Sequence, residues 1–285
     1  NIFELTSQVP QPARLSHHLN DRQVSHCYSL PCANDIKPGI KIKQGYIHHI
    51  AAVYRHFYVI TDGDSKSDFN AYLRRFKGKT LNSLKRKINK VEQSNHQQQT
   101  FISFTNPTEV EEFLNIAKSI SEKSYQEKLL HRSLPTDNKF IDKLKALAQT
   151  GNFRGYILYA EDTPIAYNLC PIYGNGIMLY DYTGYDPDYS RYSAGTVLQY
   201  KIIQQCFADP TIHAYDLCTG EGKHKEYFAN GFTTCCDAYF FPARARYFLL
   251  VYSRFIIEHS ARLVISILAK AGIKSRIKTF IRRLK

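Results

Sequence analysis

The fold is decided by a strand, a turn, a helix, a second strand and a loop that read, in chain order, GIMLYDYTGYD (176–186), SAGT (193–196), VLQYKIIQQCFAD (197–209), HAYDLC (213–218) and TGEGKHKEYF (219–228). The turn of small residues lies between a strand and the first turn of a helix. In that position a turn presents backbone N–H groups that can bind a phosphate. The stretch therefore predicts an α/β domain with an anion-binding turn.

Two short motifs in this stretch, YSAGTVL (192–198) and DLCTGEGKHK (216–225), resemble those of a known family. The family is the GNAT-type acyltransferase domain of proteins encoded with cellulose and exopolysaccharide synthesis genes. It is related to the Fem-type transferases, which add amino acids to cell-wall precursors. Its patterns run roughly Y-S-P-G-T-x-L and D-F-x-x-G-x-x-x-Y-K. The matching positions are Ser193, Gly195, Thr196, Leu198, Asp216, Gly220 and Lys225.

Two positions depart from the family patterns. Ala194 stands where the family usually has Pro, and His224 stands where it has Tyr. The first change should loosen the turn, because proline fixes φ. The second removes a phenol that could position substrate. The resemblance extends from Leu73 to Phe241 and implies a GNAT-type fold, an acyl-CoA donor and direct transfer that needs orientation and a base.

The flanking sequence predicts the remaining elements of the domain. A strand at 99–104 is followed by helices at 107–125 and 136–152, and three strands with hairpin turns at EDTP and YGNG fill 153–186. With the stretch above, the order becomes β-α-α-β-β-β-α-β, which is the GNAT arrangement that the resemblance implies. The resemblance implies a GNAT-type mixed β-sheet flanked by helices, whereas the pattern alone predicts only a mixed α/β domain.

We predict three segments along the chain. They are an N-terminal region at 1–95, the GNAT-type acyltransferase domain at 96–243, and an amphipathic helix with a basic tail at 244–285. Whether the first segment forms a degenerate second GNAT-like half, as Fem-type proteins often show, is open at this point.

Within the first segment, YIHHIAAVYRHFYVI (46–60) is apolar, aromatic and β-branched, and it predicts a strand or strand pair. DFNAYLRRF (68–76) begins a helix with Ser67 or Asp68 as its N-cap, and Gly78 interrupts it. Apolar residues then recur at helical spacing, so we expect that stripe to dock while the basic residues occupy the other face.

The net charge of +13 is concentrated in two runs. Residues 74–90 carry eight Lys or Arg and residues 270–285 carry seven, neither run contains an acid, and together they exceed the whole net excess. These runs, rather than the whole surface, should therefore attract an anionic partner. The first run is either a solvated helix face or a contact to an anionic substrate, a nucleotide sugar or RNA. No RNP-type aromatic motif supports sequence-specific nucleic-acid binding.

The seven cysteines show no C-x-x-C spacing and no companion histidine pattern for zinc. We therefore expect reduced, buried thiols in a cytosolic protein, and no metal. Cys27 and Cys32 could pair if the compartment were oxidising. The first residues lack the charged and apolar regions of a signal peptide. The expected location is the cytoplasm, with peripheral attachment to the inner face of the membrane.

The run RARYFLLVYSRFIIEHSARLVISILA (244–269) is apolar, but it does not have the pattern of a membrane span. Arg254, Glu258 and Arg262 fall four residues apart on one helical face, where a spanning helix could hardly accept them. We expect a helix that lies on the protein or in a membrane interface. The basic tail that follows makes an anionic membrane surface an expected partner.

Four residues of the SAGT turn and helix start are the candidates for binding acetyl-CoA or another acyl-CoA: Ser193, Gly195, Thr196 and Val197. Gly195 permits close backbone approach, and the N–H groups of Gly195 to Val197 could bind the pyrophosphate. The alternative is an ordinary loop-to-helix join with Ser193 as its cap.

The candidate catalytic residues are Asp216, His224 and Lys225. Asp216 is either a structural acceptor for the loop at Gly220 or a general base whose pKa burial raises. His224 is the motif side chain that titrates near neutrality, so it could accept a proton from an amine or hydroxyl. Lys225 could neutralise a phosphate, pair with Asp216, or be an exposed loop lysine. Asp181, on the preceding strand, could face the same site.

The expected function is acyl-CoA-dependent N- or O-acyl transfer to a polar, sugar-linked or amine-bearing acceptor in envelope or exopolysaccharide metabolism. One alternative is a Fem-like aminoacyl transferase, whose charged-tRNA donor would use both basic runs. Another is a non-catalytic scaffold for a polysaccharide synthase at the membrane, which the departures at Ala194 and His224 and the basic tail would suit. Binding of acetyl-CoA separates the acyl-CoA enzyme from the scaffold.

Overall fold

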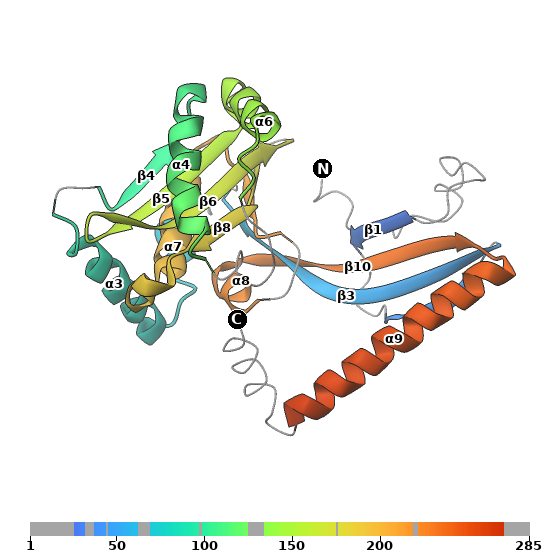
Figure 1. The fold of residues 1–285 in the computed structure, drawn as a ribbon. Coiled ribbons are helices and arrows are strands. Elements are labelled where there is room, and N and C mark those ends of the chain that lie inside the picture. The colour runs from blue at the N-terminus through green and yellow to red at the C-terminus, as the bar shows by residue number, and fades with distance from the viewer. Residues whose placement is uncertain are drawn as a thin grey trace. The chain divides into compact units, whose positions relative to one another are not determined.

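A computed structural model describes the backbone of residues 26–31, 37–43, 45–61, 69–96, 99–124, 134–174, 176–218 and 222–270 (Figure 1). The chain divides into two compact units. The first unit contains His56–Phe232, and the second combines Ile2–Arg55 with Thr233–Lys285. These boundaries differ from those of the predicted segments, because the basic helix before residue 95 packs into the core of the first unit. Whether residues 1–95 derive from a second GNAT-like half stays a prediction.

The first unit is built on a mostly antiparallel sheet. Its strands are β4 (Phe101–Phe104), β5 (Phe153–Ala160), β6 (Thr163–Tyr173), β7 (Ile177–Leu179), β8 (Tyr182–Tyr185), β9 (Ala214–Asp216) and the end of β3 (Tyr46–Ile60). They follow the order β3-β9-β7-β6-β5-β4, and β8 pairs with β6 beyond β7. The mixed sheet flanked by helices is confirmed, and so are the strands predicted at 99–104 and 46–60. The prediction of three strands over 153–186 is partly wrong, because the last of them divides into β7 and β8, which pair with different parts of β6.

Helices cover both faces of this sheet (Figure 1). On one face lie α3 (Gly78–Glu92) and α7 (Ala194–Ala208), which share a core with Tyr156 and Leu158 of β5. On the other lie α4 (Val110–Ser121) and α6 (Asn138–Gln149), packed against Phe153 and Ile157 of the same strand. The alternation of side chains along β5 thus supplies both cores.

Local sequence explains how several elements begin. A capping box joins Asn106 and Glu109 in the 3-10 turn η1 (Pro107–Glu109), which leads directly into α4. Asp137 caps α6 through its side chain, which accepts from the Phe140 N–H. Gly78 is confirmed as a boundary, since α2 (Phe69–Leu73) ends before it and α3 starts on it. The N-cap options Ser67 and Asp68 lie outside the described residues.

The turns also follow the sequence pattern. Glu161 and Asp162, which join β5 to β6, both have positive φ, at 54° and 53°. That is the geometry of a two-residue type I′ hairpin, and it confirms the turn predicted at EDTP. The predicted loop 219–228 is partly wrong, because Lys223–Phe228 forms the short helix α8. Phe228 of that helix is buried in the first unit's core, so packing selects helix over loop there.

The second unit contains β1 (His26–Pro31), β2 (Gly39–Lys43), the greater part of β3, β10 (Gly231–Pro242) and the helix α9 (Ala245–Lys270). β10 lies between β1 and β3, and β2 pairs with β3. A small core joins Ile47, Phe241, Tyr247 and Val251. The helix predicted at 244–269 is confirmed. No helix of the described residues has the length and apolar content needed to cross a membrane.

The described cysteine side chains are all free thiols, and Cys170, Cys206, Cys235 and Cys236 are buried. The expectation of reduced, buried thiols agrees with these positions. The alternative pairing of Cys27 with Cys32 falls outside the described side chains. Within the described part of the chain, no group of three or more His, Cys, Asp or Glu is placed to hold a metal ion.

Candidate functional site

Two neighbouring parallel strands separate in the middle of the first unit's sheet. β7 and β9 pair in parallel up to Leu179 and Asp216, and the last bond runs from the Tyr180 N–H to the Asp216 carbonyl at 2.8 Å. Beyond that point β8 stays with β6, whereas the chain after Asp216 bonds to β3 through the Leu217 N–H and the Phe57 carbonyl at 3.0 Å. The separation places the end of β9 beside an edge of β8.

Asp216 lies where the two strands separate, and its side chain makes two hydrogen bonds, with His56 and with the Cys218 N–H. Its Oδ1 lies 2.6 Å from Nε2 of His56 and accepts the Cys218 N–H at 2.7 Å. The Asp216 side chain is 7% exposed and that of His56 is 16% exposed. His56 shares a sheet face with Asp216 because Tyr58 lies opposite Asp216 and His56 is two residues away along β3. We call His56, Tyr180, Asp216, Cys218 and Lys225 the separation site.

His56 was not among the residues predicted from the sequence. It lies 160 positions from Asp216 and outside both motifs. The available signal was its place in the strand 46–60, where a histidine among apolar residues could have been flagged as a polar group aimed at one face of the sheet.

Cys218 and Lys225, the two members of the separation site that follow Asp216 in the chain, are joined by a hydrogen bond. Nζ of Lys225 donates to the Cys218 carbonyl at 3.2 Å, and Cys218 itself has a positive φ of 59°. Lys225 is buried, and this lowers the pKa of its amine, although the charges of Cys218 and Asp216 oppose the shift. The alternative of an exposed loop lysine is therefore wrong. Burial raises the pKa of the Cys218 thiol to about 12, so a thiolate nucleophile is not available there at neutral pH.

The other predicted site residues lie around this cluster. His224 is exposed in the first turn of α8, with its ring centroid 6.3 Å from that of Tyr180. Desolvation by neighbouring groups and the nearby charge of Lys225 lower the pKa of His224. Asp181 follows Tyr180, and partial desolvation raises the pKa of its carboxyl. Gly220 lies outside the described residues.

The short helix α8 is held by two residues that precede α3. The guanidinium of Arg75 donates to the carbonyls of Tyr227, Phe228 and Ala229. The Tyr72 hydroxyl donates to the Phe228 carbonyl at 2.7 Å. A cation at these carbonyls satisfies the end of the helix and its dipole. Arg75, one of the basic residues expected to attract an anion, therefore has a structural role in positioning Lys225.

The start of α7 has fewer N–H groups available to bind a ligand than the sequence predicted. The N–H groups of Thr196 and Val197 both donate to the Ser193 carbonyl, at 2.9 and 3.2 Å. Ser193 adopts a left-handed conformation with φ of 52°, and its side chain makes no capping hydrogen bond. The alternative of a Ser cap is therefore wrong. Ala194 and Gly195 remain as the first-turn N–H groups without a hydrogen bond in the described part of the chain, and Gly195 is exposed with open space at its Cβ position.

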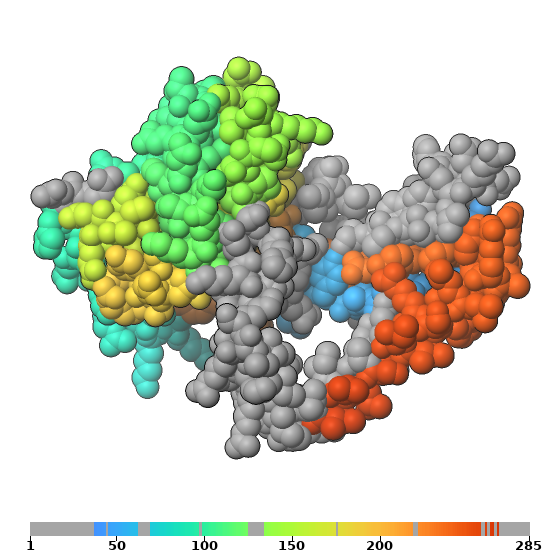
Figure 2. Space-filling model, viewed as in Figure 1, coloured from blue at the N-terminus to red at the C-terminus, as the bar shows by residue number. Residues whose placement is uncertain are grey.

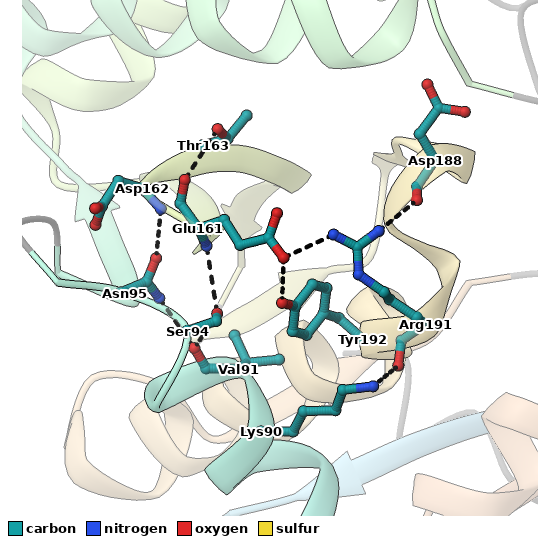
Figure 3. Close-up of polar contacts among 10 residues, drawn as sticks. All are labelled: Lys90, Val91, Ser94, Asn95, Glu161, Asp162, Thr163, Asp188, Arg191 and Tyr192. Carbon is teal, nitrogen blue, oxygen red and sulfur yellow. Dashed lines mark hydrogen bonds and ion pairs between the residues drawn. The ribbon is translucent and has the colours of Figure 1, made fainter.

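A polar network fixes the segment that leads into α7 (Figure 3). Glu161 of the β5–β6 turn accepts from Arg191 at 2.7 Å and from the Tyr192 hydroxyl at 2.6 Å. Both partners belong to the 3-10 segment η2 (Pro187–Tyr192) immediately before Ser193. Nζ of Lys90 on α3 donates to the Arg191 carbonyl at 3.1 Å. Two cations thus lie next to the start of α7.

The same turn is tied to the end of α3 by its backbone (Figure 3). The Glu161 N–H donates to Oγ of Ser94 at 3.3 Å, and the Asp162 N–H donates to Oδ1 of Asn95 at 3.0 Å. Along the solvent side of α3 lies an open hollow of about 790 Å³, lined by Asn82, Lys85, Arg86, Asn89, Lys90, Gln93 and Ser94. Its cations favour an anionic ligand.

Comparison with known families identifies the class of protein to which this fold belongs. Residues 78–226 match the sequence model of the acetyltransferase (GNAT) domain, so the chain belongs to that family. Membership of this family supports a transferase of acyl groups. A search of curated proteins finds no match to this chain.

Several solved structures are similar in fold. The C-terminal domain of a putative lysylphosphatidylglycerol synthetase from Agrobacterium fabrum is 12% identical, with a TM-score of 0.45 over 73% of this chain and 65% of that one. L-PGS from Bacillus licheniformis is 15% identical, with a TM-score of 0.45 over 74% and 66%. FemX is 9% identical, with a TM-score of 0.43 over 75% and 67%. The chain spans slightly less than two thirds of the first two structures.

Proposed function

We propose that the chain is an acyl-CoA-dependent N- or O-acyltransferase that acts on a polar, amine-bearing or sugar-linked acceptor. The observation that carries the proposal is the separation of β8 from β9 beside the paired side chains of Asp216 and His56. An acyl group bound at the end of β9 would lie within reach of these polar groups. The envelope or exopolysaccharide context rests on the sequence resemblance.

The edge of β8 that faces away from β6 suits the amide-bearing arm of coenzyme A. The Asp186 N–H bonds to the Ile165 carbonyl, so by alternation the backbone of Gly184 also faces β6 while that of Thr183 and Tyr185 faces away. No other strand of the described residues pairs with that edge. A pantetheine arm could add to it as an extra strand. Its pyrophosphate would lie at the first N–H groups of α7, near Arg191.

A second candidate is a Fem-like transfer from aminoacyl-tRNA, which the hollow along α3 favours. Lys85, Arg86 and Lys90 line it and are exposed. Binding through such cations should fall steeply as salt rises. Calorimetry with acetyl-CoA and with tRNA at two salt concentrations separates the two donors.

Replacement of Gly195 by valine should abolish acyl-CoA binding while the fold stays intact. In the free protein an added Cβ meets no atom within 4 Å, so the side chain should obstruct only a ligand that approaches the backbone. The measurement is calorimetric titration with acetyl-CoA, with the melting temperature as the check on folding.

Gly78→Val is the matched control, because Gly78 also opens a helix and has open space at its Cβ position. It should bind acetyl-CoA like the wild type. Unchanged affinity in the Gly195→Val variant would remove the start of α7 as the phosphate site.

We also propose that α9 attaches the protein to an anionic membrane surface on the cytoplasmic side. Eight large apolar side chains of this helix are exposed: Leu249, Leu250, Tyr252, Ile256, Ile257, Leu263, Val264 and Ile267. Part of α9 is uncovered in the space-filling view (Figure 2). Apolar exposure of this extent marks an interaction surface. The seven basic residues among 270–285 select an anionic leaflet as the partner.

Deletion of residues 270–285 should therefore abolish sedimentation with anionic vesicles. Each basic residue near such a leaflet contributes roughly 1 kcal/mol before salt screening. We expect the full chain to bind phosphatidylserine-containing vesicles but not phosphatidylcholine vesicles, and to be released by salt. Leu249→Ser with Ile256→Ser should weaken binding as well, because both side chains are exposed. Equal binding to both vesicle types would contradict the electrostatic part of the proposal.

A further inference from the structure

We propose that His56 is the proton acceptor of the transfer reaction and that Asp216 positions it. The inference rests on the proposed function, because it assigns a role in acyl transfer. His56 lies outside residues 78–226, which match the family model. The general base would therefore come from β3, a strand that precedes the matched region.

The geometry of the pair prepares His56 to act as a base. Nε2 of His56 lies 2.6 Å from Oδ1 of Asp216, so the carboxylate selects the tautomer with a proton on Nε2. Nδ1 is then the nitrogen with a free lone pair. The Cys218 N–H donates to the same carboxylate oxygen at 2.7 Å and restrains its orientation. A histidine held in this way is a prepared base, as in other pairs where a carboxylate orients an imidazole.

His56 is the more exposed member of the pair. The Asp216 side chain is 7% exposed, whereas that of His56 is 16% exposed. Of the two members, the imidazole is therefore the one that an acceptor can reach more easily. Asp216 lies behind it and stabilises the imidazolium that forms when a proton is taken. Asp216 therefore has the positioning role, and His56 contacts the acceptor.

The neighbouring side chains are less suited than His56 to accept the proton. The Cys218 thiol has a pKa of about 12, so it stays protonated. The Lys225 amine is buried and donates to the Cys218 carbonyl. The exposed ring of His224 packs near Tyr180, and no carboxylate among the described residues accepts a hydrogen bond from it to orient it. His56 is the histidine with such a carboxylate partner among the described residues of the site.

In the proposed step, the acyl group passes from the sulfur of coenzyme A to the acceptor, and His56 carries the proton. The acceptor oxygen or nitrogen attacks the thioester carbonyl carbon, and a new C–O or C–N bond forms while His56 Nδ1 takes the acceptor's proton. The C–S bond then breaks, and its electron pair leaves with sulfur. The proton passes from the imidazolium to the thiolate, which releases coenzyme A as a thiol and restores the neutral histidine. No oxidant, reductant or metal takes part.

The test uses the whole chain with acetyl-CoA as donor and water as the probe acceptor, and it measures release of the coenzyme A thiol. His56→Ala should lower the rate by about 10²-fold. Acetyl-CoA affinity measured by calorimetry should stay within about twofold, because the imidazole acts on the acceptor. Added imidazole should restore the rate of His56→Ala by about tenfold or more, since it can occupy the space of the missing ring. His96→Ala is the control, because His96 is exposed and lies in the turn after α3.

The tautomer gives a readout that does not depend on turnover. Long-range nitrogen–proton NMR spectra should show the His56 proton on Nε2 in the wild type, and Asp216→Asn should lose that preference. Wild-type binding of acetyl-CoA with thiol release that His56→Ala does not lower would overturn the role of His56 and leave the proposed function standing. Loss of activity without imidazole rescue, or binding without any thiol release by the wild type, would also overturn it. Failure of the wild type to bind acetyl-CoA would overturn the proposed function itself.

Discussion

Replacement of Asp216 by asparagine should lower turnover by about 10²-fold or more with little change in acetyl-CoA affinity. The carboxylate oxygen accepts from both His56 and the Cys218 N–H. An amide at this position can present its NH₂ group to Nε2 and so favour the other tautomer of His56. In that tautomer Nδ1 carries the proton and cannot accept another. The measurements are steady-state thiol release and calorimetric donor affinity on the same preparation.

Asp209→Asn is the matched control for this prediction. Asp209 is also a partly buried aspartate of the first unit and pairs with Arg154 at 2.9 Å, yet it lies at the far end of α7 from the start of that helix. Its loss should lower stability without changing turnover per folded molecule. Normal turnover in the Asp216→Asn variant would return Asp216 to a purely structural role, holding the backbone of Cys218.

Replacement of Gly155 by valine should destabilise the first unit severely. Even a Cβ at this position would lie 2.6 Å from Cδ2 of Phe113, closer than such atoms can approach. Phe113 is fully buried and packs against Phe104 and Phe153, with ring centroids 5.7 and 5.8 Å away, so it has little room to move. Overpacking of this kind costs about 2 to 3 kcal/mol. The melting temperature should fall by roughly 4 to 12 °C, measured by calorimetry or circular dichroism.

A second substitution tests the cause of that loss. In a Phe113→Leu background, the Gly155→Val change should cost at least about 1 kcal/mol less, because the clashing ring is absent and contacting positions couple. Gly78→Val serves as the control for the valine itself, since its Cβ would meet nothing within 4 Å. Equal cost of Gly155→Val in both backgrounds would show that the backbone, and not Phe113, limits this position.

Structural features that depend on a few neighbouring residues could be predicted from the sequence. The strands, the helix at 194–208 and the turn at Glu161 and Asp162 follow from periodicity and turn chemistry within short windows. The prediction was partly wrong at 219–228, where six residues are too few to show helical periodicity and the packing of Phe228 decides the structure. The position where α7 starts was predicted correctly. The prediction of which N–H groups are available to a ligand was not correct, because those of Thr196 and Val197 donate to the Ser193 carbonyl.

The residues of the candidate site divide in the same way. Asp216 and Lys225 could be singled out as motif positions, and both lie in the separation site. His56 could not be joined to them, because it meets Asp216 only through the antiparallel pairing of β3 with β9. The role of Arg75 in holding α8 was equally hidden. Within the sequence it is one of eight basic residues in a charged run.

By itself, the sequence determined the mixed α/β class and the turn that begins α7, since backbone propensity and hydrophobic period act over a few neighbouring residues. Only the tertiary structure decided which polar groups meet at the end of β9 and which N–H groups at α7 stay open. Those outcomes depend on strand register and on where the pairing of β7 with β9 ends, and contacts between residues 160 positions apart leave no periodic trace in one chain.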